Sequence, residues 1–245
     1  MLKQVSVDGR TDEVAVELPL EIRLNGSPVA VTMRTPGHDF ELAAGFLYGE
    51  GIVSAAPRVD LPPDLAANTV DVIDASAVAP SARRFYTTSS CGICGKGALE
   101  EVEAIAPVVS GGPTVARSLL ASLPDRLEQP GFERTGGLHA TGLFSASGEA
   151  VAVREDVGRH NAMDKVVGWA LLSAALPLTE SLLCVSGRLA FELVQKAARA
   201  GAPILVGVGA PTSLAVELAE DRGITLAGFA RNGRANVYTH PERVS

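Results

Sequence analysis

The fold is decided by residues 181–229, which read SLLCVSGRLAFELVQKAARAGAPILVGVGAPTSLAVELAEDRGITLAGF. Short apolar runs, typical of buried strands, alternate there with stretches of helical periodicity that end before Gly201 and at Gly223. We expect strands at 182–185, 204–208 and 224–229, and helices at 189–200 and 213–221. This order of elements predicts parallel strands covered by helices, an arrangement in which ligands bind at the carboxyl ends of the strands.

Three segments follow these strands and are therefore expected at the ligand-binding edge of the sheet. They are residues 186–188 (SGR), 207–212 (GVGAPT) and 229–234 (FARNGR). The second segment opens a helix, so its backbone N–H groups could bind a phosphate, although an ordinary tight turn explains it equally well. In the third segment Arg231 and Arg234 could hold phosphates, and a solvated turn is the alternative.

The remaining patterns predict a mixed α/β protein (α+β overall) with two domains. The first part contains a β-hairpin within residues 14–34, turning at Asn25-Gly26, and a helix that opens at Thr35-Pro36. We expect Phe40, Ala43, Ala44 and Leu47 to share one face of that helix. The other expected elements are strands at 70–73 and 84–88, a short helix at 98–105, a hairpin of 138–144 with 149–154, and a helix at 161–172. A linker at 107–114 gives a small α+β domain of residues 1–110 and a larger domain of residues 111–245.

Composition excludes several classes of function. The 245 residues include 28 acidic and 21 basic side chains, and the net charge of −7 argues against a general binder of nucleic acid or anionic membranes. Aromatic residues make up 4% of the chain, too few for a stacking platform on single-stranded nucleic acid. The polar N-terminus and the absence of a long unbroken apolar stretch predict a cytoplasmic protein.

Two of the three cysteines form the motif Cys91-Gly92-Ile93-Cys94. In a reducing compartment this spacing indicates redox, metal or sulfur chemistry, with glycines that give the loop reach and Lys96 placed to lower a thiol pKa. A structural zinc ion needs four ligands, and the sequence contains no second Cys-x-x-Cys. The alternative is a pair of inert buried cysteines. Cys184 lies in an apolar run and is expected to be a small core residue.

Residues 154–161 (REDVGRHN) crowd polar and charged side chains between an expected strand and an expected helix. Acidic residues suit the start of a helix, so a solvated helix start explains the segment. A functional site explains its density of charge equally well, and both interpretations stay open. His139, alone in an expected strand, is more typical of a core histidine than of a ligand.

Several motifs taken together are similar to one known family. They are residues 91–95 (CGICG), 135–140 (TGGLHA), 155–165 (EDVGRHNAMDK), 186–188 (SGR), 210–215 (APTSLA) and 228–241 (GFARNGRANVYTHP). In this order they resemble the formate dehydrogenase accessory sulfurtransferases, the FdhD family. One departure is Leu189-Ala190 after the SGR motif, where the family pattern suggests a more polar pair.

The resemblance implies a sulfurtransferase that takes persulfide sulfur from a cysteine desulfurase and delivers it to the molybdenum or tungsten bis-guanine-dinucleotide cofactor of formate dehydrogenase. It implies that Cys91 carries the persulfide and that Cys94 is accessory. It also implies a homodimer, a larger domain with a cytidine-deaminase-like fold, and no permanently bound metal. The residues implied in cofactor binding are Phe229, Ala230, Arg231, Asn232, Gly233 and Arg234.

Two other functions remain as alternatives. A zinc nucleobase deaminase needs His-x-Glu upstream of Pro-Cys-x-x-Cys. Here the His-x-Glu at His240 lies downstream of the cysteines, and Ser90 precedes Cys91. The second alternative is a non-catalytic chaperone that holds the cofactor, for which Cys91 would be dispensable.

Overall fold

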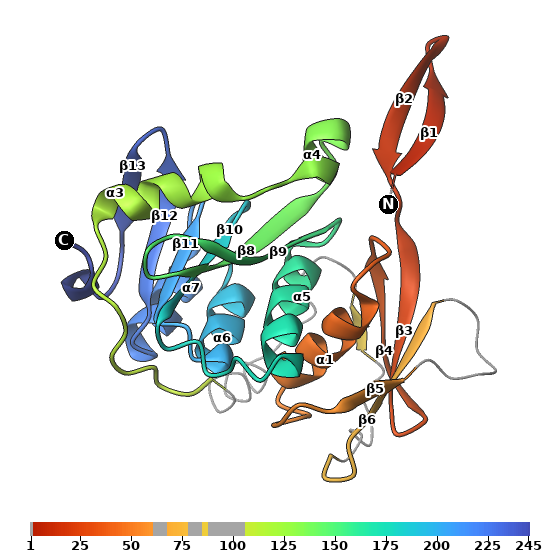
Figure 1. The fold of residues 1–245 in the computed structure, drawn as a ribbon, viewed down its shortest axis with the longest axis horizontal. Helices are drawn as coiled ribbons and strands as arrows, with labels where there is room; N and C mark the ends of the chain where they lie inside the picture. Colours follow the sequence, from red (N-terminus) through yellow and green to blue (C-terminus); the bar gives the residue numbers. More distant parts are fainter. Residues whose placement is uncertain (1, 61–67, 78–84, 88–105) are drawn as a thin grey trace. The chain divides into compact units, whose positions relative to one another are not determined.

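The structure is a computed structural model that describes residues 2–60, 68–77, 85–87 and 106–245 (Figure 1). Cys91, Cys94 and the helix expected at 98–105 lie outside the described residues. Contacts between Cα atoms divide the chain into two compact units. Unit 1 comprises Met1–Cys94, Gln129–His139 and Glu155–Ser173, and unit 2 comprises Gly95–Glu128, Ala140–Arg154 and Ala174–Ser245. The two units interleave along the sequence. The division into a domain of residues 1–110 and a domain of residues 111–245 stays a prediction.

Unit 1 contains a five-stranded sheet in the order β5-β6-β3-β4-β7. The strands are β3 (Leu18–Leu24), β4 (Ser27–Arg34), β5 (Arg58–Asp60), β6 (Thr69–Ile73) and β7 (Phe85–Thr87). The predicted hairpin is confirmed as β3 and β4, whose turn places Asn25 and Gly26 at φ of 49° and 80°. A positive φ at both central positions matches the twist of the two flanking strands, which explains the Asn-Gly pair.

Two helices of unit 1, α1 (Asp39–Gly49) and α5 (Arg159–Leu172), pack closely against each other. A Cβ atom added to Gly45 would lie 1.9 Å from the backbone oxygen of Asp164, and one added to Gly168 would lie 1.8 Å from that of Glu41. Glycine is therefore required at both crossing positions. Of the residues predicted to share one face of α1, Ala43, Ala44 and Leu47 are fully buried, whereas Phe40, in the first turn, is 39% exposed.

The helix predicted to open at Thr35-Pro36 begins later, at Asp39, after His38 in a left-handed conformation. The reason is that the backbone of Thr35 is bonded to residues distant in sequence: its N–H donates to Asp156, and its carbonyl accepts from Lys165. Unit 1 also contains a two-stranded hairpin of β1 (Leu2–Val7) and β2 (Arg10–Ala15), and the short helix α4 (Pro130–Thr135). The hairpin was not predicted, although Asp8-Gly9 at its turn is the kind of pair that favours one.

Most of the six-stranded sheet, in the order β13-β12-β11-β10-β8-β9, belongs to unit 2. Its strands are β8 (His139–Ser145), β9 (Ala150–Asp156), β10 (Ser181–Val185), β11 (Ile204–Gly207), β12 (Thr225–Arg231) and β13 (Arg234–Val237). Strands β10, β11 and β12 are parallel, which confirms the predicted order, and β8 and β13 add antiparallel neighbours on the two sides.

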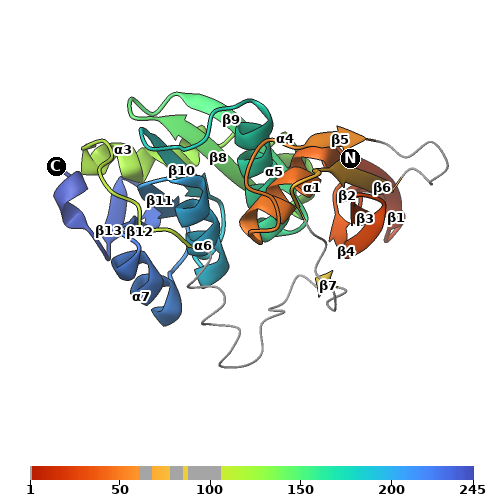
Figure 2. The same cartoon turned by 90° about the horizontal axis from the view of Figure 1, so that it is seen from below.

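The helices of unit 2 cover both faces of this sheet. The helix α3 (Arg117–Ser122) and the 3-10 helix η1 (Leu123–Arg126) pack on one face, where Leu120 and Leu123 join Phe144 and Cys184 in the core. The connecting helices α6 (Phe191–Ala200) and α7 (Ser213–Asp221) lie on the other face (Figure 2). In the part of the chain that the structure describes, no helix is long and apolar enough to cross a membrane.

Candidate functional site

The three segments expected at the carboxyl ends of the parallel strands are joined by backbone hydrogen bonds. The N–H of Gly209 donates to the carbonyl of Gly187 at 3.0 Å, and the N–H of Phe229 donates to the carbonyl of Gly209 at 3.0 Å. Gly209 thus links the segments that follow β10 and β12. We call residues 186–188, 207–212 and 229–234 the strand-end platform.

Glycines let the backbone of the platform pack without intervening side chains. A Cβ atom on Gly209 would lie 3.0 Å from the Cα of Arg188, and one on Gly228 would lie 3.0 Å from the Cδ of Pro211. Beside them Thr212 caps α7, since its hydroxyl accepts the N–H of Ala215 at 3.3 Å. The platform is therefore a surface built from backbone at the edge where parallel sheets bind ligands.

The tail segment differs in part from its prediction. The expected strand was to end at Phe229, but β12 continues to Arg231, and the turn at Asn232-Gly233 leads directly into β13. The register shifts between Gly228 and Arg231, and Phe229 adopts a φ of 52°. This bulge explains why the side-chain alternation changes, so that Phe229 is 38% exposed while Ala230 is fully buried.

Charge on the platform is positive, and the described residues of the chain do not neutralise it. Arg188, Arg231 and Arg234 are all exposed, and Arg231 pairs with Arg234 across the β12–β13 turn. Within the described part of the chain no acidic side chain forms an ion pair with any of the three. Unpaired arginines beside a helix start and exposed loops suit a phosphate-bearing ligand.

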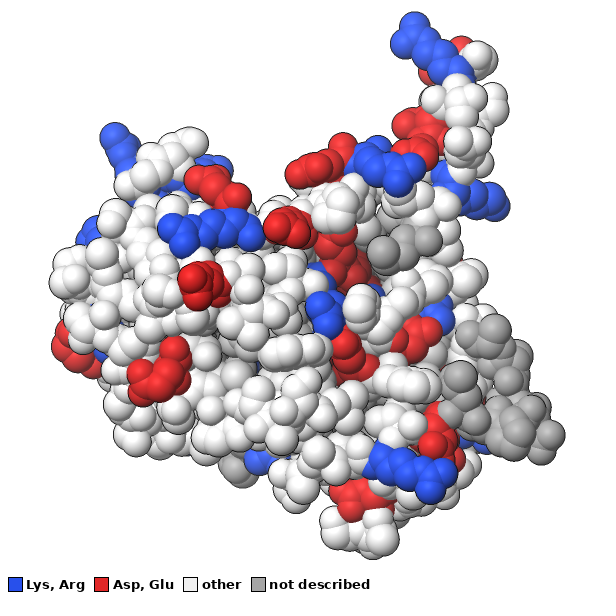
Figure 3. All heavy atoms as spheres, viewed as in Figure 1, with Lys and Arg blue, Asp and Glu red and all other residues white. Residues whose placement is uncertain are grey.

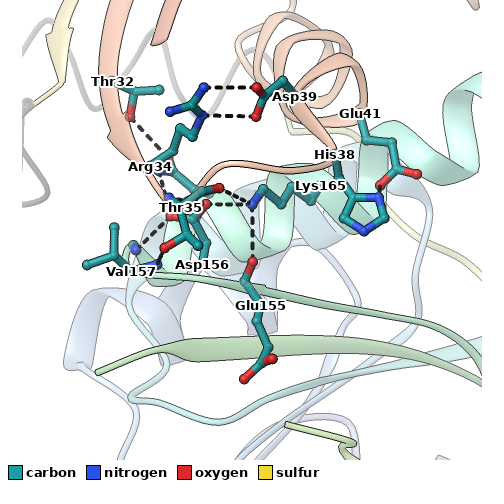
Figure 4. A network of polar contacts seen from close by, with 12 residues as sticks. Thr32, Arg34, Thr35, His38, Asp39, Glu41, Glu155, Asp156, Val157 and Lys165 are labelled. Atoms are coloured by element: carbon teal, nitrogen blue, oxygen red, sulfur yellow. Dashed lines mark hydrogen bonds and ion pairs between the residues drawn. The ribbon is translucent and has the colours of Figure 1, made fainter. Parts of the chain in front are cut away.

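The polar cluster at residues 154–161 has a different character, shown in Figure 4. The Nζ of Lys165 lies 2.7 Å from the Oδ2 of Asp156, and the two side chains are 1% and 0% exposed. The same ammonium donates to the backbone oxygens of Thr35 and Glu155, at 3.0 and 3.1 Å. All three N–H bonds of the ammonium therefore have acceptors inside unit 1.

The carboxylate of Asp156 is equally saturated. It accepts the backbone N–H groups of Thr35 (3.2 Å) and Gly158 (2.9 Å) and the side-chain amide of Asn161 (3.0 Å). The neighbouring carboxylate of Glu155 accepts the N–H groups of Gly131 and Phe132 at the start of α4. The prediction of a solvated helix start is thus wrong for Asp156, because these groups form an internal brace within unit 1.

His139 and Arg159 stand near this brace. Burial and the positive charge of Arg159 lower the pKa of His139, while the Asp156 carboxylate opposes the shift. The Nε atom of Arg159 is buried and has no hydrogen-bond partner in the described structure. Sequence reasoning gave Thr35 a role only at the start of a helix, and Lys165 appeared only as part of the 155–165 motif.

Of the cysteines, Cys184 alone falls among the described residues. It is fully buried in the core of unit 2, as predicted, and burial raises its pKa well above the usual range of a thiol. A nucleophilic sulfur at neutral pH must be a thiolate, so Cys184 is unsuited to sulfur transfer. Among the described residues no group of three or more histidine, cysteine, aspartate or glutamate side chains is placed to hold a metal ion.

The chain is similar over nearly its whole length to known proteins of one family. A model of the FdhD/NarQ family matches residues 15–245. The sulfur carrier protein FdhD of Streptomyces coelicolor is 50% identical and aligns with 100% of this chain and 93% of its own length. That of Mycobacterium tuberculosis is 50% identical over 96% of this chain and 93% of its own. A crystal structure of a candidate formate dehydrogenase accessory protein from Desulfotalea psychrophila matches with a TM-score of 0.77 and 29% identity, covering 100% of this chain and 98% of that one.

Proposed function

Because the chain belongs to the FdhD/NarQ family, we propose that it is a sulfur carrier that takes sulfur as a persulfide on Cys91 and serves as an accessory of formate dehydrogenase. The sulfur carriers that are 50% identical to it over nearly their whole length support this class of activity. The observation that carries the residue assignment is the burial of Cys184, since it leaves Cys91 and Cys94 as the available thiols.

The loading step needs no external oxidant or reductant. The thiolate of Cys91 attacks the outer sulfur of a persulfide on a cysteine desulfurase, and a new S–S bond forms. The S–S bond on the desulfurase breaks, and its cysteine leaves as a thiolate. The transferred sulfur keeps its oxidation state, so atoms and electrons balance. We assign Cys94 an accessory role in this exchange.

The acceptor in this proposal is the molybdenum or tungsten bis-guanine-dinucleotide cofactor, bound as a client by the strand-end platform. The exposed arginines at 231 and 234 suit the phosphates, and the exposed ring of Phe229 suits the face of a guanine. Backbone N–H groups at the Asn232-Gly233 turn add donors without adding charge. Ala230, being buried, serves this segment as its anchor in the core.

The remaining parts of the proposal come from the family and from composition. They are a cytidine-deaminase-like fold for the larger domain, a homodimer, a cytoplasmic location, and a cysteine desulfurase and formate dehydrogenase as partners. They also include no permanently bound metal.

Activation of formate dehydrogenase tests the proposal in cells whose own sulfur carrier has been deleted. Cys91→Ala should abolish the activity, whereas Cys184→Ala, at the buried cysteine, should retain it. If Cys91→Ala still supports full activity, the protein acts instead as a non-catalytic chaperone that holds the cofactor.

A further inference from the structure

Tyr238 follows the last residue of β13, just outside the strand-end platform, and is 39% exposed. Its two neighbours in the chain are anchored in unit 2. Val237 packs against the hydrophobic core, and Thr239 is 2% exposed. Tyr238 therefore presents its ring to solvent from a segment that is otherwise held inside the unit.

Three hydrogen bonds fix the backbone around Tyr238. Its N–H donates to the carbonyl of Leu226 at 2.8 Å. The hydroxyl of Thr239 accepts the N–H of Leu226 at 3.0 Å and donates to the carbonyl of Ile224 at 2.6 Å. Because a tyrosine side chain has only two χ angles, a fixed backbone leaves the ring few positions to adopt. A ring held in this way loses little conformational entropy when a ligand covers it.

The ring of Tyr238 lies beside Gly228 of the neighbouring strand β12. A Cβ atom added to Gly228 would lie 3.2 Å from the Cε2 of Tyr238 and 3.0 Å from the Cδ of Pro211. The same atom would lie 3.1 Å from the backbone oxygen of Gly209. Since Pro211 and Gly209 belong to the platform, the missing side chain of Gly228 lets the tyrosine ring lie at the border of the platform.

Phe229 places a second exposed ring next to the same glycine. Its φ of 52° is rare for a bulky residue, and strain of this kind is typically retained at functional sites. Gly228 is thus flanked by two exposed aromatic residues, Phe229 next to it in the chain and Tyr238 beside it in the sheet. The hairpin of β12 and β13 also carries the exposed Arg231 and Arg234.

We propose that the ring of Tyr238 contacts the base of the guanine nucleotide whose phosphates Arg231 and Arg234 hold, which adds a base-binding residue outside the segment 229–234. Stacking on a base needs an exposed aromatic face, and phosphates need charged donors. A planar base has two faces, so it is able to contact Tyr238 as well as Phe229. This inference rests on the proposed function, of which it deepens the client-binding part.

The test separates the base from the phosphates by means of two probes, GDP and inorganic pyrophosphate, whose binding is measured by calorimetry. Tyr238→Leu removes the ring, and Tyr238→Phe keeps the ring without its hydroxyl. The matched control is Phe40→Leu, which removes an aromatic residue of equal exposure from α1 in unit 1. Arg234→Ala is the reference for the loss of a phosphate contact.

We expect Tyr238→Leu to weaken GDP binding by about 10- to 100-fold, the effect of losing one stacking contact with a base, and to leave pyrophosphate binding unchanged. Tyr238→Phe and Phe40→Leu should bind both probes as the wild type does. Arg234→Ala should weaken the binding of both probes. In NMR spectra of the wild-type protein with labelled tyrosine, the ring signals of Tyr238 should shift with GDP and not with pyrophosphate. Tyr238→Phe identifies these signals by their absence.

Wild-type affinity for GDP in folded Tyr238→Leu would overturn the inference and leave the proposed function intact. An equal loss for GDP and pyrophosphate, or an equal loss in Phe40→Leu, would also overturn it, because the ring would then not act on the base. If the wild-type protein binds neither probe, the client-binding part of the proposed function itself fails. If Tyr238→Leu does not fold, the NMR shift in the wild-type protein decides the matter alone.

Discussion

The 154–161 cluster and the strand-end platform are two described regions that the sequence marked as candidate sites, and their polar groups are arranged in opposite ways. In the cluster, Asp156 and Lys165 are buried and every polar atom of their head groups has a partner in unit 1. On the platform, Arg188, Arg231 and Arg234 are exposed and have no ion-pair partner in the described chain. Density of charge in a sequence therefore does not distinguish an internal brace from exposed charge that is open to a ligand.

Figure 3 shows acidic and basic side chains interspersed on one face of the molecule. No large field of one sign gathers there. On this face a ligand would therefore meet dispersed charges of both signs rather than a charged surface.

The largest effect is expected from breaking the buried pair in the cluster. Lys165→Met leaves the Asp156 carboxylate buried without its counter-charge, which should lower the free energy of unfolding of unit 1 by about 3–5 kcal/mol. Urea denaturation measures the loss, and Lys3→Met, at an exposed position of β1, serves as the control with a change within about 0.5 kcal/mol. Equal stabilities of Lys165→Met and the control would mean that the cluster is not a brace.

A smaller effect, and on binding rather than stability, is expected on the platform. Arg234→Ala removes a charged phosphate contact worth about 1.5–3 kcal/mol, so GDP binding should weaken by roughly 10- to 100-fold. Calorimetry with GDP measures it, and Arg10→Ala on the β1–β2 hairpin is the control. Sulfur uptake at Cys91 should be unchanged. Equal GDP affinities of Arg234→Ala and the wild type would mean that residues 229–234 form only a structural turn. The nucleotide site would then have to be sought at residues 207–212.

The close backbone contacts of the platform give the next test. Gly209→Ala places a methyl group 3.0 Å from the Cα of Arg188 and 3.1 Å from the backbone oxygen of Gly187. We expect a loss of about 1–3 kcal/mol in stability, together with weaker GDP binding, since backbone must shift. Gly137→Ala is the control, because its nearest contact would be an ordinary 3.5 Å. A fully stable Gly209→Ala with wild-type GDP affinity would show that the platform is not held by this contact.

The smallest effect concerns the pH dependence of stability near the cluster. The pKa of His139 lies below its usual 6.5, first because of burial and then because of Arg159. Protonation therefore favours the unfolded chain, so stability is complete above about pH 6.5 and is lost as the pH falls through the lower folded-state pKa. Urea denaturation of His139→Gln across this range should show a shallower fall than the wild type. A steeper fall would reverse the sign of the assigned shift.

The elements between residues 181 and 221 were predictable because their signals are local, whereas α3, η1 and β13 were not predicted. Helix α7 spans the predicted residues 213–221, and β10 and β11 differ from their predictions by one residue. The failures have non-local causes. Thr35 cannot open a helix because Asp156 and Lys165, more than a hundred residues away, hold its backbone. The extension of β12 to Arg231 depends on pairing with β13. The Asn232-Gly233 pair between the two strands favours such a hairpin, but it was interpreted only as a turn beside a ligand.

The site was predictable to a similar extent. The three segments of the platform were expected at one sheet edge because parallel strands bring their carboxyl ends together, and the structure joins them through Gly209. The outward turn of Phe229 and the burial of Ala230 were not predictable, since a bulge changes the alternation that a sequence pattern assumes. The role of the 154–161 cluster stayed open because its hydrogen-bond partners are distant in sequence. They lie in β4 and at Thr35, just after that strand.

The central claim is that sulfur is carried on Cys91, and mass spectrometry after incubation with a cysteine desulfurase and cysteine tests it most directly. The account predicts one added, reducible sulfur atom on the peptide that contains Cys91 and Cys94. The addition should disappear in Cys91→Ala and persist in Cys184→Ala. An adduct on the Cys184 peptide, or no adduct on any peptide, would contradict the account.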